Sequence, residues 1–178
     1  MKKPLYILLF ILSTALTQPA QAQDDTANQG VLSAQEFVQK VGVANQFEME
    51  SSELALQRSQ REDIKEFARL MITDHGAVGD SLKTAVSGAG LKVEDIPEVL
   101  DPKHAAIMTG LKAAAPEEFD QKYVRVQKDG HDEAVELFQS YMSGGDNAVL
   151  REFAAATLPT LKQHQDHIHQ FTEIALGN

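Results

Sequence analysis

The 178-residue chain contains no cysteine and carries a net charge of −10. The absence of cysteine excludes disulfide-stabilised folds, thiol chemistry and thiolate-ligated metals, so any metal site must use histidine, carboxylate or methionine ligands. The acidic balance disfavours nucleic acids and anionic membrane surfaces as partners, because both repel an acidic protein.

Residues 1–22 have the pattern of a secretory signal peptide. Two lysines precede an apolar run over residues 5–16, and residues 20–22 form a small-x-small cleavage pattern. The run is shorter than the roughly 18 residues of a membrane span, so we predict cleavage after Ala22 and no transmembrane anchor in the mature protein. The mature chain would have 156 residues and, without the two lysines, a charge of −12. We expect it in the periplasm or associated with the outer membrane.

Residues 23–32 are polar and aperiodic, which predicts a flexible leader before a single domain over residues 33–178. Within this domain apolar residues recur at spacings of three and four, the period of amphipathic helices. A capping box over residues 33–36 opens a first helix that reaches about residue 59. A second capping box over residues 59–62 predicts the start of the next helix, which ends in the Gly-containing segment 87–90.

The segment 91–115 interrupts this pattern, and Asp101 followed by Pro102 predicts a short helix within it. Pro116 opens a third long helix, which has Met142 on its inward face and ends at two glycines, 144 and 145. Asp146 is expected to cap a fourth long helix. Pro159 inside that helix predicts a kink or a junction of two helices.

Four long amphipathic helices bury their apolar faces most simply as a four-helix bundle. The connector of about 25 residues between the second and third helices allows either a direct return or a crossover along the bundle. We therefore predict an all-α, ferritin-like four-helix bundle with a short extra helix in the connector.

One polar residue interrupts the apolar face of each long helix. These residues are Glu48, His75, His131 and His164, in chain order. At a rise of about 1.5 Å per residue, all four lie near the middle of the bundle, within one or two turns of each other. Three neutral imidazoles and one carboxylate form a suitable ligand set for Zn, Cu, Ni or Fe.

Neighbouring polar residues are expected to orient the imidazoles through hydrogen bonds: Asp74, Asp120 and Gln127. Asp74 is turned about 100° from His75 on a regular helix and is therefore a poor co-ligand. A metal-free alternative remains open, in which Glu48 pairs with the histidines in a buried polar network.

A second candidate metal site lies near the C-terminus. His164 and His167 are three residues apart and can chelate one ion on a helix surface. The alternative is that polar and cationic residues are simply favourable near the C-terminus of a helix.

The motifs that are missing also restrict the function. No Glu-x-x-His sequence occurs in the chain, which disfavours a carboxylate-bridged di-iron centre. No HExxH motif, phosphate-binding loop or Ser-His-Asp order is present either, so we assign no catalytic residue. An enzyme with an open coordination position on its metal stays an alternative without a supporting substrate motif.

Three segments resemble a bacterial domain-of-unknown-function family, number 4142. They are FARLMITDH (67–75), FDQKY (119–123) followed by His131, and LPTL (158–161) followed by His164. The resemblance covers about residues 33–176 and implies an exported ferritin-like bundle of the periplasm or outer membrane. It also implies a glutamate in the first helix at Glu48 or Glu50, of which helical phase favours Glu48. The pair Ser51-Ser52 departs from the aliphatic-Gly pair that is usual there.

Two functions from different classes fit these observations. The first is an exported bundle that binds a transition metal for storage, buffering or stress protection. The alternative is a structural or interaction protein of the envelope with a metal-free Glu/His network. The identity of the metal is open in the first function, the protein partner is open in both, and a homo-oligomer is compatible with either.

Overall fold

Six helical segments make up the computed structural model, which describes residues 32–176, with side chains described through residue 171. They are α1 (Ala34–Arg58), α2 (Glu62–Gly88), the 3-10 helix η2 (Val93–Asp95), α3 (Pro102–Lys112), α4 (Pro116–Gly144) and α5 (Ala148–Leu176). The described residues contain no strand, which confirms the all-α class. The predicted signal peptide and almost all of the predicted leader lie outside the described residues.

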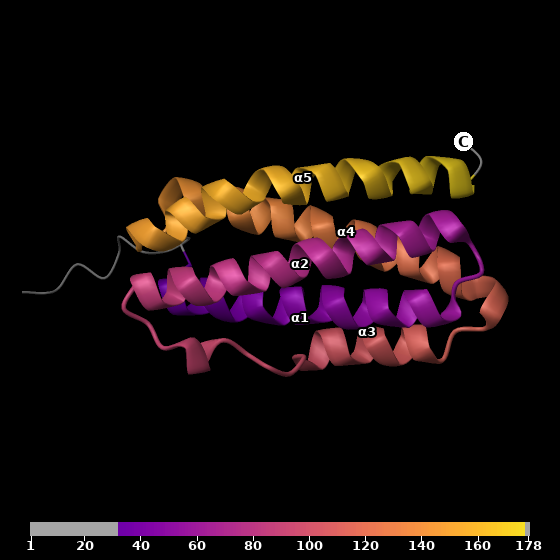
Figure 1. Ribbon diagram of the computed structural model, residues 1–178, viewed down its shortest axis with the longest axis horizontal. Helices are drawn as coiled ribbons and strands as arrows, with labels where there is room; N and C mark the ends of the chain where they lie inside the picture. The colour runs from indigo at the N-terminus through magenta and orange to yellow at the C-terminus, as the bar shows by residue number, and fades with distance from the viewer. Residues whose placement is uncertain (1–31, 177–178) are drawn as a thin grey trace, which may run out of the picture.

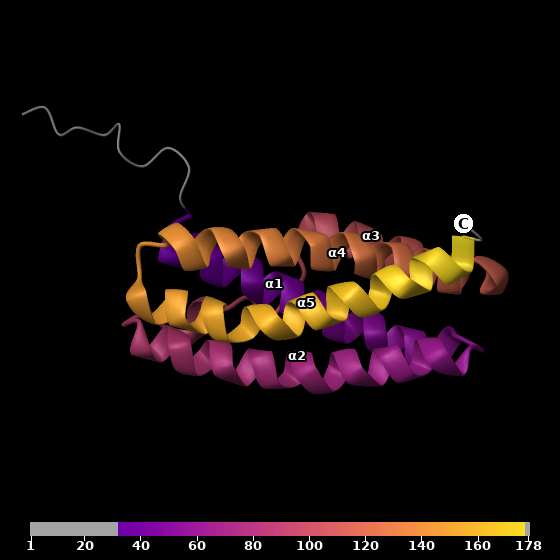
Figure 2. The same ribbon diagram turned by 90° about the horizontal axis from the view of Figure 1, so that it is seen from above.

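The long helices form two antiparallel hairpins, α1 with α2 and α4 with α5 (Figure 1). The connector with η2 and α3 runs along the bundle, so that α4 starts at the end opposite to where α2 finishes (Figure 1). Across the hairpins, α1 packs against α4 and α2 against α5 (Figure 2). The connector therefore takes the crossover path rather than the direct return.

The connector is seated closely on α1. A Cβ atom added to Gly42 would lie 2.8 Å from Cδ of Pro97 and 2.9 Å from Cγ2 of Ile96, so only glycine allows this approach. At the other end of α1, the Arg58 guanidinium donates to the carbonyl oxygens of Leu111, Lys112 and Ala114 at 3.0, 2.7 and 2.6 Å. These contacts hold α3 along the side of the bundle.

The apolar core is divided into two clusters along the bundle axis. One cluster includes Phe37, Leu82, Phe138 and Leu150, and the other includes Phe67, Tyr123, Ile168 and Phe171. On α2, α4 and α5, the residues of one cluster precede a buried histidine and those of the other follow it. The core is thus apolar at both ends and polar in the middle.

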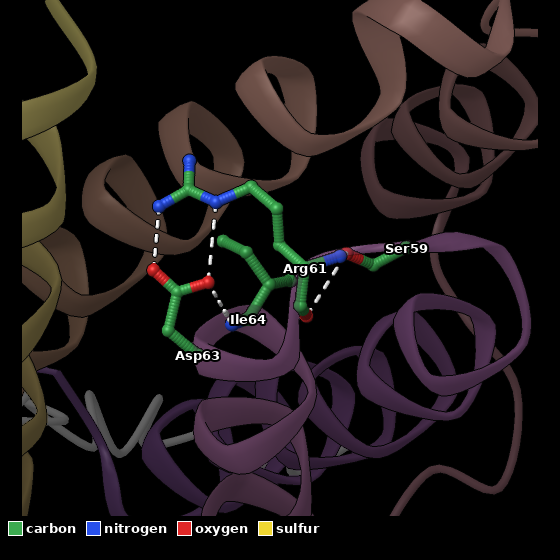
Figure 3. Close-up of polar contacts among 4 residues, drawn as sticks. All are labelled: Ser59, Arg61, Asp63 and Ile64. Atoms are coloured by element: carbon green, nitrogen blue, oxygen red, sulfur yellow. Dashed lines mark hydrogen bonds and ion pairs between the residues drawn. The ribbon is translucent and has the colours of Figure 1, made fainter.

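The capping box at residues 33–36 is confirmed, but the second one, at residues 59–62, is wrong. The N-cap of α2 is Arg61, which makes no side-chain cap. Ser59 Oγ instead accepts from the Arg61 amide at 3.1 Å, and Asp63 Oδ1 accepts from the Ile64 amide at 2.9 Å (Figure 3). Asp63 also binds the Arg61 guanidinium (Figure 3). Glu62 pairs with Arg69. The serine hydroxyl is used within the turn and is not available to the helix.

Three details of the second hairpin differ from expectation. Asn147 rather than Asp146 caps α5, because its Oδ1 accepts from the amides of Val149 and Leu150 at 3.0 and 3.2 Å. Asp146 instead accepts a 2.9 Å hydrogen bond from the Tyr141 hydroxyl. Tyr141 is buried, whereas Met142, which was predicted to face inward, is 36% exposed. The segment containing Pro159 is one continuous helix and not a junction of two, and it curves along its length (Figure 2).

Candidate metal centre

Three buried histidines from three helices meet in the polar layer of the core. His75 lies on α2, His131 on α4 and His164 on α5, and they are only 5%, 1% and 2% exposed. One potential ligand atom from each lies within 4.8 Å of the other two. Their ring centroids are 5.4–5.8 Å apart. The structure thus brings together three of the four residues that the sequence predicts as ligands.

Each imidazole uses one nitrogen in a hydrogen bond that orients the ring. His75 Nδ1 lies 3.0 Å from Oδ1 of Asn45, and His131 Nδ1 lies 2.9 Å from the carbonyl oxygen of Gln127. His164 Nε2 lies 2.8 Å from Oδ2 of Asp74. All three partners are acceptor oxygens, so the bonded nitrogen of each ring carries the proton.

The second nitrogen of each ring is buried and has no hydrogen-bond partner in the protein: Nε2 of His75, Nε2 of His131 and Nδ1 of His164. In a neutral imidazole whose other nitrogen is the donor, this nitrogen carries a lone pair. Each of the three neighbouring rings therefore has a lone pair to which no group donates a hydrogen bond. Buried polar atoms are rarely left without a partner, and a cation is the species that accepts three lone pairs at once.

Burial favours the neutral form of His75 and His164. Burial, followed by the proximity of His131 and His164, holds the pKa of His75 well below its usual value. Burial also lowers the pKa of His164, although the hydrogen bond to Asp74 opposes this shift. Metal binding requires neutral imidazole, so the lowered pKa values of His75 and His164 favour the form that binds a metal.

Glu48, the fourth predicted ligand, lies on α1 beside this cluster. It is 5% exposed, and its Oε2 atom is buried without a partner. A Cβ atom on Gly130 would lie 3.0 Å from Glu48 Oε1, which places the carboxyl next to the backbone that precedes His131. Glu48 is not among the residues whose ligand atoms lie within 4.8 Å of one another. Burial raises its pKa, against an opposing effect of His131.

A chain of hydrogen bonds supports the backbone of α1 and α4 next to Glu48. Gln127 Nε2 donates to Ser51 Oγ at 3.0 Å, and Ser51 Oγ donates to the Glu48 carbonyl oxygen at 3.2 Å. The hydroxyl groups of Ser52 and Tyr123 are 3.0 Å apart. The two serines are completely buried. Because both serines are small, Tyr123 and Gln127 can reach α1. The pair Ser51-Ser52, which replaces the expected aliphatic-Gly pair, therefore has a structural role.

Two of the three residues that were predicted to orient the histidines do so in the structure. Asp74 and Gln127 both make hydrogen bonds to histidines of the cluster, Gln127 through its backbone carbonyl. Asp120 has a buried Oδ1 atom with no partner, and no hydrogen bond joins it to the histidines. Sequence reasoning missed Asn45, which orients His75. The signal was present, since Asn45 precedes Glu48 by three residues on the same helix.

The surface chelate predicted for His164 and His167 does not form on the surface. His164 is buried and bonded to Asp74, whereas the His167 ring packs at 5.3 Å from the Phe67 ring and 5.1 Å from the Phe171 ring. The apolar face of α5 takes His164 inward, because it continues the series of Leu161 and Ile168.

A family model described as "Domain of unknown function (DUF4142)" matches residues 16–171. The chain belongs to this family. The match confirms the resemblance of the three sequence segments, and it extends over all of the cluster residues of this DUF4142 chain. No curated protein and no solved structure matches the chain. In the described part of the chain, no helix is both long enough and apolar enough to cross a membrane.

Proposed function

We propose that this DUF4142 protein binds a transition metal ion through His75, His131 and His164. The observation that carries the proposal is the set of three lone-pair nitrogens, all buried and all without a donor. Three imidazole ligands suit Zn, Cu, Ni or Fe, and a carboxylate such as Glu48 would partly balance the charge of the ion.

The spacing of the three nitrogens is compatible with a bound ion. At metal–nitrogen distances of about 2.0–2.1 Å, the nitrogens of a tetrahedral site lie about 3.3 Å apart. From separations of up to 4.8 Å, each nitrogen needs to move by less than about 1 Å toward the centre. Small rotations of the imidazoles supply this movement, and the hydrogen bonds at the outer nitrogens keep the rings facing inward.

The metal-free alternative is supported less well. A buried Glu/His network would join the carboxylate of Glu48 to a histidine by a hydrogen bond. Instead Glu48 Oε2 and the inner nitrogens of the three histidines are all buried without partners. The three histidines therefore bring together acceptor nitrogens without a donor, an arrangement that a cation stabilises and that a hydrogen-bond network leaves unsatisfied.

The biological role that we propose is metal storage, buffering or protection against metal stress by an exported, ferritin-like bundle. The crossover connector supports the ferritin-like assignment, and the signal-peptide pattern of residues 1–22 supports export. N-terminal sequencing of the protein from a periplasmic fraction tests export. A mature N-terminus at Gln23 is expected, and an intact N-terminus in the cytoplasmic fraction would contradict it.

Elemental analysis of protein purified without an affinity tag tests metal binding. We expect a bound transition metal in the wild type and in the control His169→Ala, whose histidine is half-exposed and bonded to Asp132. We expect none in His75→Ala combined with His131→Ala. A wild-type protein without metal, whose melting temperature does not rise on addition of Zn, Cu, Ni or Fe, would overturn the proposal.

A further inference from the structure

A cleft of about 1030 Å³ reaches the histidine cluster from the side. It lies between α1 and α4 and under the connector, and we call it the α1–α4 cleft. Its inner end is lined by Glu48, His75, Gly130 and His131. The volume lies at the upper limit of small-molecule sites, which are apolar clefts with a few convergent polar groups.

The walls of the cleft are defined by side chains that are themselves held in place. Phe47 of α1 and Ala134 of α4 both line the cleft. The connector forms the outer wall through His104, which packs against Phe47 at a ring distance of 5.2 Å and is bonded to Asp101 at 2.7 Å. His104 is therefore fixed by two contacts and is only 19% exposed.

The ligand set is incomplete on the side of the cluster that faces this cleft. The three histidines come from α2, α4 and α5, and α1 contributes no atom to the group within 4.8 Å. Three histidines and an open fourth position are the pattern of metal sites that exchange a ligand, whereas structural sites have four protein ligands. The α1 side holds Glu48, whose Oε2 atom has no donor.

We propose that a metal bound by the three histidines takes an exchangeable fourth ligand from the α1–α4 cleft, and that Glu48 accepts a hydrogen bond from this ligand. The proposal rests on the proposed metal site. The ligand class is a small neutral molecule with one lone pair for the metal and one N–H or O–H group for Glu48. Its apolar part extends between Phe47 and Ala134. Water fulfils the polar requirements, and an imidazole-type molecule fulfils both the polar and the apolar ones.

The test uses the full chain loaded with Co²⁺, whose visible absorption depends on the ligands and geometry of the ion, with imidazole as the probe. In the wild type we expect a saturable spectral change while the Co²⁺ content, measured after desalting, stays constant. Ala134→Phe should reduce the affinity for imidazole by about tenfold or more, because the larger side chain occupies the cleft. Ala156→Phe, an exposed position on α5, is the matched control and should bind as the wild type does.

The outcomes separate this inference from the proposed function. A Co²⁺ spectrum that imidazole leaves unchanged, with the metal still bound, overturns the inference and leaves the metal site standing. Equal imidazole affinities of Ala134→Phe and the wild type overturn the cleft as the route. If neither Co²⁺ nor any of Zn, Cu, Ni and Fe binds, the proposed function itself fails. Should Ala134→Phe not fold, Ala44→Phe fills the same cleft from α1 and is expected to give the same loss.

Discussion

Asp74 accepts a 2.8 Å hydrogen bond from His164, across from α2 to α5, although the two residues are 90 positions apart. Since His75 is the next residue after Asp74, α2 supplies one histidine to the cluster and also orients the histidine of α5. The two residues point about 100° apart around the helix, which lets one enter the cluster while the other reaches the neighbouring helix.

Replacing Asp74 with asparagine should weaken metal binding without unfolding the protein. The carboxylate fixes His164 with its proton on Nε2 and its lone pair on Nδ1, and loss of such a partner typically reduces metal affinity about 10- to 100-fold. Competition with a chelator of known affinity measures the change. Asp166→Asn on the exposed side of α5 is the control. Equal affinities of Asp74→Asn and the wild type would show that the hydrogen bond does not position the ligand.

The stability of the metal-free protein should decrease as the pH falls below about 6.5, the ordinary pKa of histidine. Because the pKa of His75 in the folded protein is lowered, the unfolded chain binds a proton there that the folded chain does not. The free energy of unfolding is therefore highest above the pKa of histidine in the unfolded chain, and it decreases on acidification. His75→Gln should make the pH dependence shallower by up to about 1.4 kcal/mol per pH unit.

Urea unfolding in the presence of a chelator, at a series of pH values between neutral and mildly acidic, measures this slope. His169→Gln is the control, because its histidine lies outside the cluster, is half-exposed and is bonded to Asp132. The slope of the control should match that of the wild type. A slope in His75→Gln as steep as that of the wild type would mean that His75 is not the group that titrates.

Glu48→Gln should stabilise the metal-free protein, and more so at alkaline than at acidic pH. The raised pKa of Glu48 means that ionisation opposes folding, and this penalty grows as the pH rises above the ordinary value of 4.5. Glutamine has the same size and still fits beside Gly130. Unfolding free energies at a mildly acidic and a mildly alkaline pH test the sign. Glu50→Gln, which changes a half-buried glutamate bonded to Gln46 on the same helix, is the matched control.

Arg58→Lys should destabilise the protein by about 1–3 kcal/mol, because lysine has no planar fork to bind three carbonyl oxygens at once. The guanidinium also lies 4.9 Å from the ring centroid of Phe119, a contact that lysine would reproduce poorly. Arg69→Lys, which changes an exposed ion pair with Glu62, should shift stability by less than about 0.5 kcal/mol. Thermal unfolding of both variants provides the comparison. Equal stabilities would show that Arg58 does not anchor α3.

The sequence by itself determined the helices and the inward position of the three histidines. Amphipathic periodicity is a local property, so it predicts which face is buried, and glycine and proline mark the ends of helices independently of the rest of the fold. His75, His131 and His164 occupy positions of the same helical period, so they face the core. Local sequence failed where side chains had alternatives: Ser59 bonds within its turn, and Asn147 rather than Asp146 caps α5.

Only the tertiary structure decided which residues meet. The crossover connector determines that α1 lies beside α4 and α2 beside α5, and this pairing brings Asp74 to His164 and Glu48 to Gly130. The position of Glu48 beside the three-histidine group, and the cleft that reaches it, depend on how closely α1 and α4 approach under the connector. Helical phase fixes the direction of a side chain, whereas the distance between two side chains on different helices depends on packing.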